Sequence, residues 1–153
     1  MLFAYRNDER CSRYQRYEDT SLAYLKEYVQ RYACCQFLSK EEEQHYAICS
    51  RDGEYLIGDL SVFYSCKDNC FTLGLTVSPD FQGMGYGYEL LREVVRQLRI
   101  HHSDADLVAL IEKGNGPSLS LFRKLNFVEE CYADSIESYV YVNYSRRELD
   151  AGE

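Results

Sequence analysis

The spacing of apolar residues is helical in the first third of the chain. We expect two helices there, one over residues 8–17 capped by Asp8, and one that starts at Asp19 or Thr20 and runs to about residue 36. Residues 39–42 match a capping box and predict one more helical turn. The second helix has a single apolar face, formed by Leu22, Leu25, Val29 and Ala33.

The middle of the chain has a strand-like pattern. Residues 45–50, 55–64 and 70–78 are three apolar-rich runs separated by two short turns. The first turn, residues 51–54, contains Asp-Gly, which is a strong hairpin signal, and the second covers residues 66–69. Three strands joined by such short connections are expected to form an antiparallel meander.

An amphipathic helix is expected after Pro79 and a cluster of glycines. Its apolar face is formed by Leu90, Leu91, Val94, Val95 and Leu98. A continuous apolar run at residues 107–111 then predicts a strand that is covered on both faces. Residues 117–125 predict a short helix that ends at Asn126, because asparagine tolerates the left-handed conformation.

The last elements are a predicted hairpin, with strands over residues 127–133 and 138–144. The whole order is helices, three strands, helix, strand, helix and two strands. It predicts one mixed α/β domain over residues 1–145, followed by a polar tail over residues 146–153.

Charge and hydropathy exclude several classes of partner. The chain has 153 residues and a formal net charge of −8, so it lacks the basic footprint that nucleic-acid binding needs. Its apolar runs are shorter than the roughly 20 residues that a membrane span requires, and its first nine residues are too charged for a signal peptide. We therefore expect no nucleic-acid partner, no membrane insertion and a cytoplasmic location.

The seven cysteines predict neither disulfides nor a metal site. An odd number of cysteines without a secretion signal argues against a disulfide framework. Cys66 and Cys70 are separated by three residues, and no second pair lies at zinc-ligand spacing. We expect reduced thiols that behave as small hydrophobic residues.

A glycine-rich turn between a strand and a helix is the most informative segment. Glycine permits positive φ and a close approach of the backbone, and the first amides of a helix attract anions. Residues 82–87, Gln-Gly-Met-Gly-Tyr-Gly, therefore predict a site for phosphate or pyrophosphate. A dinucleotide fingerprint would need glycine in place of Tyr88, and a Walker loop would need Gly-Lys-Ser/Thr. The alternative is a turn that is rich in glycine for geometry alone.

This turn resembles the signature of the GNAT superfamily of acyl-CoA-dependent N-acetyltransferases, Gln/Arg-x-x-Gly-x-Gly/Ala. The preceding strand, residues 73–81, is also similar to that family. A second segment, residues 115–127 (Asn-Gly-Pro-Ser-Leu-Ser-Leu-Phe-Arg-Lys-Leu-Asn-Phe), resembles its Asn-x-x-Ser…Leu-Tyr-x-Lys-Leu-Gly-Phe pattern. The resemblance covers about residues 46–144, and the first third is less diagnostic.

The resemblance implies a mixed sheet of about six or seven strands, flanked by helices and splayed open in the middle. The pantetheine arm of acetyl-CoA would pair with the strand backbone in the split, and the pyrophosphate would lie on the glycine turn. Asn115 would face the arm near the thioester. The implied binding residues are Leu75, Thr76, Val77, Gln82, Gly83, Met84, Gly85, Tyr86, Gly87, Asn115, Ser118 and Phe122. The family also suggests a possible homodimer, and no metal.

The sequence departs from the family at two catalytic positions. Phe122 stands where the family often has a tyrosine that protonates the leaving thiolate, and Thr72 stands where it often has a glutamate base. As replacements we predict Glu112 as the base and Tyr132 as the acid. Other candidates are Tyr139 as acid, His45 as base and Asp59 as a residue that faces the acceptor pocket. Solvated or surface roles are the alternatives for these side chains.

We therefore expect an N-acetyltransferase that moves acetyl from acetyl-CoA to a primary amine of a small molecule, peptide or protein. One alternative is a catalytically silent acyl-CoA-binding module, and another is an unrelated α/β domain whose turn binds nothing. Several tyrosines of the first third suggest either a cation–π pocket for an amine or a helix packing face: Tyr14, Tyr17, Tyr24, Tyr28 and Tyr32.

Overall fold

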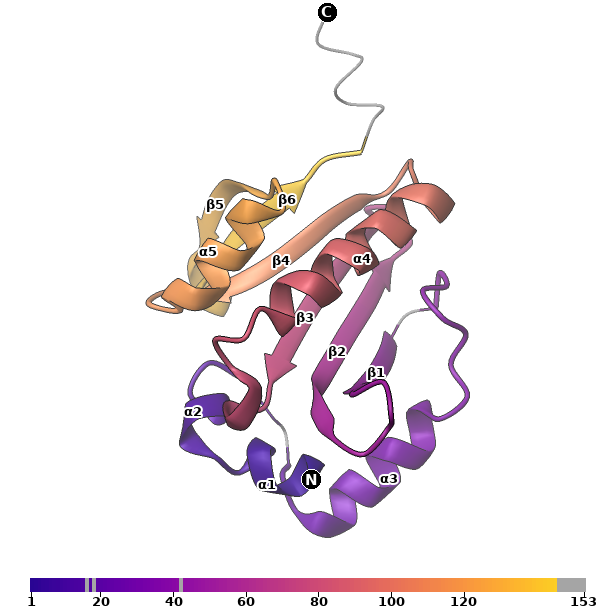
Figure 1. Cartoon of the computed structure of the whole chain (residues 1–153). Coiled ribbons are helices and arrows are strands. Elements are labelled where there is room, and N and C mark those ends of the chain that lie inside the picture. The colour runs from indigo at the N-terminus through magenta and orange to yellow at the C-terminus, as the bar shows by residue number, and fades with distance from the viewer. Residues whose placement is uncertain (16, 18, 42, 146–153) are drawn as a thin grey trace, which may run out of the picture.

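The computed structural model describes residues 1–15, 17, 19–41 and 43–145 (Figure 1). Its α-helices are α1 (Leu2–Arg6), α2 (Glu9–Ser12), α3 (Leu22–Tyr32), α4 (Tyr86–His101) and α5 (Gly116–Lys124). Its strands are β1 (Glu43–Cys49), β2 (Leu56–Ser65), β3 (Cys70–Val77), β4 (Asp106–Glu112), β5 (Val128–Ala133) and β6 (Ser138–Asn143). Two short 3-10 helices are η1 (Pro79–Phe81) and η2 (Asp134–Ile136). The predicted tail, residues 146–153, lies outside the described residues.

The strands form one mixed sheet with the order β1-β2-β3-β4-β6-β5. β3 and β4 are parallel, and the other neighbours are antiparallel. The β3–β4 pairing is confined to Cys70–Thr72 against Asp106–Val108, so the two strands separate after their first residues. The expected mixed sheet of about six or seven strands, splayed in its middle, is confirmed, with six strands.

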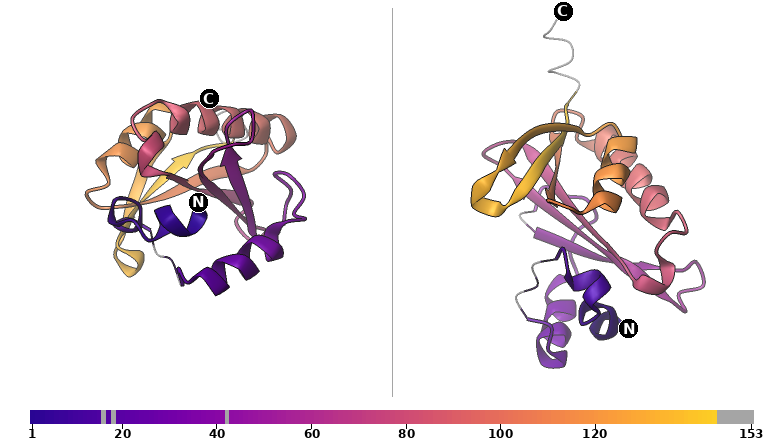
Figure 2. Two further views of the ribbon diagram at one scale, coloured as in Figure 1. Left: turned by 60° about the horizontal axis from the view of Figure 1, so that its bottom comes forward. Right: turned by 90° about the vertical axis from the view of Figure 1, so that its left-hand side faces the viewer.

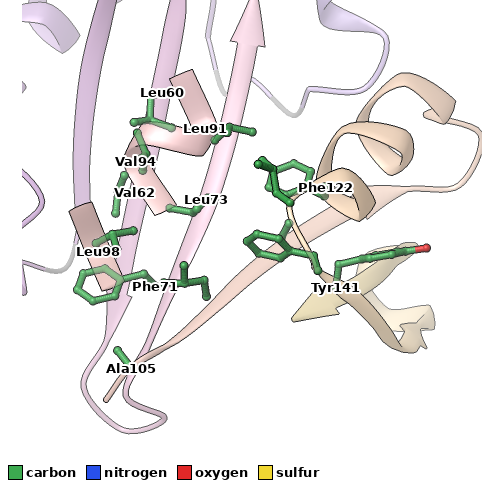
Figure 3. Close-up of a cluster of buried hydrophobic side chains, with 14 of the residues drawn as sticks. Leu60, Val62, Phe71, Leu73, Leu91, Val94, Leu98, Ala105, Phe122 and Tyr141 are labelled. Carbon is green, nitrogen blue, oxygen red and sulfur yellow. The ribbon is translucent and has the colours of Figure 1, made fainter. Parts of the chain in front are cut away.

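The helices α4 and α5 cover one face of this sheet (Figure 2). Because side chains alternate along a strand, Leu60, Val62 and Leu73 point toward α4. They pack in one buried cluster with the apolar face of that helix (Figure 3), formed by Leu91, Val94 and Leu98. The predicted face of α4 is therefore the one that is buried.

The first third differs from the prediction in its helix boundaries. Asp8 does cap a helix, with its side chain accepting from the Arg10 amide, but α2 ends at Ser12. The third helix is capped by Ser21, whose own amide donates to the Asp19 carboxylate at 2.6 Å. Asp19 therefore forms a turn ahead of the helix, because its short side chain bonds a backbone amide two residues on.

The capping box predicted at residues 39–42 does not start a helix. The Ser39 amide donates to the Gln44 side chain at 3.1 Å, and the Gln44 amide group donates to the Ser39 carbonyl at 2.7 Å. Gln44 is fully buried in β1, so this strand residue supplies the bonds that a helical turn would have made. The last residue of the predicted box lies outside the described residues.

Candidate functional site

The open half of β3 presents backbone groups that β4 does not pair with to the gap between these two strands. The Ser78 amide donates to the Ile57 carbonyl at 2.7 Å, toward β2. In an antiparallel pair, backbone groups alternate in direction from one residue to the next. Those of Leu75 and Val77 therefore point away from β2 and into the split. Such a strand edge binds an extended ligand that carries amide groups.

The glycine turn forms the second part of the site, at the end of this edge. Gly83 and Gly85 have φ of 74° and 86°, which only glycine adopts without strain. Gly85 is the N-cap of α4, and no side chain in the described ranges caps the helix. The first intrahelical bond is made by the Glu89 amide. The amides of residues 86–88 thus remain available to an anion, at the positive end of the helix dipole.

Gly87 lets the start of α4 lie close to the strand. A Cβ there would lie 3.3 Å from a Leu75 methyl and 3.4 Å from a Leu121 methyl. This tight packing holds the helix start against β3 and α5 together. The turn and the strand edge therefore keep a fixed relation to each other.

A cavity of about 550 Å³ joins these parts, which is a size typical of ligand pockets. It is lined by eleven of the twelve predicted binding residues: Leu75, Thr76, Val77, Gln82, Gly83, Gly85, Tyr86, Gly87, Asn115, Ser118 and Phe122. Met84, the twelfth, is 63% exposed and is not among the lining residues. The structure thus brings two sequence segments, about 30 residues apart, into one cavity.

Three side chains cover the carbonyls of the strand edge. Gln82 donates to the Val77 carbonyl at 2.9 Å, and the Cys11 thiol donates to the same oxygen at 3.4 Å. Gln15 donates to the Leu75 carbonyl at 3.4 Å. Cys11 and Gln15 also line the cavity, and the sequence analysis did not identify them. Neither residue carries a local signal for a partner more than 50 positions away.

The opposite wall comes from the β4–α5 connection. Asn115 is the N-cap of α5, and its side-chain oxygen accepts from the Ser118 amide at 3.3 Å. Phe122 is 4% exposed and packs edge-to-face against Phe127. The hydroxyl of Tyr14 reaches across from the end of α2 and donates to the Gly114 carbonyl at 3.2 Å. Tyr14 therefore connects the two sides of the split.

The predicted acid and base lie away from this cavity. Glu112 is the last residue of β4, half-buried and paired in register with Ser138, and is not among the cavity's lining residues. Tyr132 is on the outer strand β5, 39% exposed and in edge-to-face contact with Tyr139. Neither tyrosine is among the lining residues. Their catalytic roles remain predictions.

A second cavity, of about 390 Å³, lies between α1, α3 and the first two strands. Tyr5, Tyr28, His45 and Asp59 are among the residues that line it. Beside it, Arg6 is 5% exposed and lies 3.4 Å from the Asp59 carboxylate. Tyr5 also donates to Asp59. The two oppositely charged groups offset each other in this buried position.

Two tyrosines of the first third, Tyr17 and Tyr28, pack against this guanidinium. Arg6 lies over the Tyr17 ring at 4.7 Å and over the Tyr28 ring at 4.4 Å, and it donates to the Tyr28 hydroxyl at 3.0 Å. The faces of these two rings are therefore occupied by the guanidinium of Arg6 and not by an external amine. Tyr17 also reaches β3, where its hydroxyl lies 3.3 Å from that of Thr76.

Burial shifts the acidity of the groups at the strand edge. It raises the pKa of the Cys11 thiol to about 11 and that of Tyr17 to about 12. It also raises the pKa of Tyr5, where the Asp59 carboxylate adds to the effect. Each shift has the same cause, because a charged group loses hydration in this environment.

A family model, acetyltransferase (GNAT) domain, matches residues 1–128. The chain belongs to the GNAT acetyltransferase family. A search of curated proteins finds no match. The GNAT fold is also seen in the solved structures that resemble this chain, and the family predicted from residues 82–87 and 115–127 is confirmed.

Two structures from Vibrio cholerae illustrate the likeness. One is a spermidine N-acetyltransferase in complex with CoA and spermine, with a TM-score of 0.69, 14% identity, and coverage of 92% of this chain and 85% of that chain. The other is a putative ribosomal-protein-serine acetyltransferase, with a TM-score of 0.73, 16% identity, and coverage of 91% and 83%. A GNAT-family acetyltransferase from Bacillus anthracis has a TM-score of 0.70, 15% identity, and coverage of 94% and 86%.

Two features are absent from the described residues, a metal cluster and a membrane-spanning helix. No three His, Cys, Asp or Glu side chains gather there in a way that would hold a metal ion. Within the same residues, no helix has both the length and the apolar character needed to cross a bilayer.

Proposed function

We propose that this protein transfers the acetyl group of acetyl-CoA to a primary amine. The observation that carries the proposal is the continuity of one cavity from the glycine turn to the open edge of β3. The amides at the glycine turn and the start of α4 suit a pyrophosphate, and the basic side chains of Arg10 and Lys124 also line the cavity. The backbone groups of Leu75 and Val77 suit the two amides of a pantetheine arm. The spacing of these two features follows from the tight contact at Gly87.

The reaction makes defined demands on this site. A neutral amine nitrogen attacks the thioester carbon, the C–S bond breaks, and the thiolate takes up one proton. The negative charge that develops on the carbonyl oxygen is stabilised by a backbone N–H of the strand edge, at Leu75 or Val77. Asn115 can donate from its side-chain nitrogen to the bound arm, because its side-chain oxygen already caps α5.

The amine class of acceptor is supported by similarity and by charge. The spermidine acetyltransferase that resembles this chain was crystallised with spermine. The net charge of −8 favours the encounter with a cationic amine over that with an anionic substrate. Four acceptor classes fit the reaction: a peptide N-terminus, a lysine side chain, a polyamine and an aminoglycoside.

A thiol-release assay with acetyl-CoA tests the proposal against these four classes. We expect release of free CoA with at least one class, at a rate that rises with pH as the amine is deprotonated. Acetyl-CoA is also expected to raise the melting temperature, because it binds the folded state. Stabilisation without release for any amine would identify a silent acyl-CoA-binding module. Absence of both effects would contradict the proposal.

A further inference from the structure

The wall of the 550 Å³ cavity contains a phenol, Tyr14, that reaches from the end of α2 to the β4–α5 connection. This inference rests on the proposed function. If pyrophosphate lies on the glycine turn, the arm passes Val77 first and Leu75 next, so the thioester lies toward Leu75. Gln15 contacts the Leu75 carbonyl at 3.4 Å, and its neighbour Tyr14 extends across the split to the Gly114 carbonyl.

The other acidic groups of the cavity wall are less well placed. Tyr86 and Tyr88 lie in the first turn of α4, at the phosphate end, and are 36% and 39% exposed. Cys11 donates to the Val77 carbonyl, and Val77 lies two residues closer to the glycine turn than Leu75 does. Phe122 lines the wall near Asn115 but carries no hydroxyl. Tyr14 is the phenol that reaches the gap beside Asn115.

The hydroxyl of Tyr14 can leave its hydrogen bond to the Gly114 carbonyl and donate to a ligand instead. It donates to a backbone carbonyl at 3.2 Å, which is longer than the roughly 2.5–3.0 Å usual for O–H···O bonds. A rotation about its C–O bond redirects the proton into the cavity. The Arg13 guanidinium lies over the ring at 5.4 Å, which helps to hold the ring in place. The phenol thus keeps its position while its proton changes partner.

We propose that Tyr14 donates the proton that the departing CoA thiolate takes up. The amine nitrogen forms the C–N bond and the C–S bond breaks. The sulfur takes the Tyr14 proton, and the phenolate is reprotonated from solvent, which also receives the proton that the amine loses. The products are the acetylated amine and CoA with a free thiol. This assigns to the end of α2 the acid role that Phe122 does not fill.

The need for such a donor follows from the surroundings of the cavity. Burial raises the pKa of Cys11, a thiol in the same wall, to about 11. A thiolate that leaves into this space is desolvated in the same way, so it is a poorer leaving group than in water. Protonation of the sulfur as it leaves then accelerates the reaction. General acids typically contribute a factor of about 10² or more.

The test compares the Tyr14→Phe variant with the wild-type chain. Both are assayed with the amine that supports thiol release. We expect kcat to fall by about 10²-fold with KM for acetyl-CoA little changed, because the phenol acts in the transition state. In the wild type, kcat is expected to fall at high pH where the general acid is lost. This fall is expected to be absent from the pH profile of Tyr14→Phe. Adding Phe122→Tyr to Tyr14→Phe is expected to restore part of kcat, since it returns a phenol to the same cavity.

Two control variants test other hydroxyls. Tyr55→Phe removes a hydroxyl from a residue that is 53% exposed and outside the cavity, and is expected to retain wild-type kcat. Loss of kcat in Tyr132→Phe together with wild-type kcat in Tyr14→Phe would overturn the proposal. A raised KM with an unchanged pH profile in Tyr14→Phe would also overturn the proposal. That result would mean that the hydroxyl acts only through its structural hydrogen bond to Gly114.

A binding measurement gives a readout without turnover. Calorimetry compares the affinity for CoA with that for desulfo-CoA across pH, and the difference isolates ionisation of the bound thiol. In the wild type, hydrogen bonding from Tyr14 is expected to favour the thiolate, and this preference should be lost in Tyr14→Phe. Equal pH dependence in both proteins would overturn the proposal. An inactive wild type that binds CoA with this preference would instead contradict only the proposed turnover.

Discussion

Gly58 lies so close to Thr76 that a Cβ at residue 58 would be 2.0 Å from the Thr76 carbonyl oxygen. The contact joins β2 to the last residues of β3, where Gly58 pairs in register with Val77. Any side chain at this position must push the two strands apart. The position of the strand edge that faces the split therefore depends on a glycine in the neighbouring strand.

Gly58→Ala is expected to lower the free energy of unfolding by about 1–3 kcal/mol, as overpacked sites do. Acetyl-CoA affinity should fall with it, because the shift displaces the backbone groups of Val77. Chemical denaturation and calorimetry measure the two effects. Gly116→Ala is the matched control, since a Cβ there meets no atom within 4 Å, and its effect on stability should stay within about 0.5 kcal/mol. Equal losses in both variants would contradict the argument.

Gly85 and Gly53 offer a second matched pair. Both have left-handed φ, 86° and 74°, and a Cβ at either would meet no atom within 4 Å. Alanine at each should therefore cost about 1–2 kcal/mol in unfolding free energy from backbone strain alone. Only Gly85→Ala should also weaken CoA binding, because only Gly85 orients the amides at the start of α4. A similar loss of affinity in Gly53→Ala would show that strain, rather than the turn, is responsible.

The geometry of the proposed acetyl-CoA half of the site was predictable because its signals are local. Glycines at residues 83 and 85 adopt the positive φ that the turn requires, and Asn115 caps the helix that follows it. The apolar faces of α4 and β3 also follow from the spacing of neighbouring residues. Each of these features depends on a few consecutive positions, so periodicity and turn chemistry predict it.

The contacts of the first third were not predictable in the same way. Cys11, Tyr14 and Gln15 meet partners 60 to 100 positions away, and nothing in their own neighbourhood specifies those partners. The tyrosines around Arg6 illustrate the same limit. Their pattern indicated either a cation–π pocket for an amine or a helix packing face, and in the structure Tyr17 and Tyr28 stack on the guanidinium of Arg6.

Cys11 is expected to be the last of the cysteines to react with a thiol-alkylating reagent. Its side chain is buried, whereas Cys34, Cys49, Cys66 and Cys131 are exposed. Because burial raises its pKa from 9.0 to about 11, the neutral thiol stabilises the fold fully below pH 9, and this contribution is lost as pH rises toward about 11. Peptide mapping of labelled protein across this range measures the order of labelling.

Protection of Cys11 by ligand is a further expectation from the same position. The thiol lies in the wall of the cavity, so CoA should slow its labelling at a pH where the exposed cysteines react at unchanged rates. Labelling of Cys11 as fast as that of Cys34 at pH 8 would contradict the buried, protonated thiol. Desulfo-CoA as the ligand keeps the reagent from being consumed by a second thiol.

The Arg6–Asp59 pair is expected to contribute to stability as a unit. Both side chains are largely buried, 6% and 14% exposed, and the Arg6 Nε has no partner among the described residues. Asp59→Asn leaves the guanidinium without its counter-charge, so unfolding free energy should fall by about 3–5 kcal/mol. Arg6→Met combined with Asp59→Asn should lose less than the sum of the single variants, because neither charge is then left alone. Denaturant melts of all four proteins measure the coupling, and additive losses would show that the two charges do not depend on each other. Tyr5 donates to the same carboxylate, so the same cycle in a Tyr5→Phe background should show a changed coupling between the two charges.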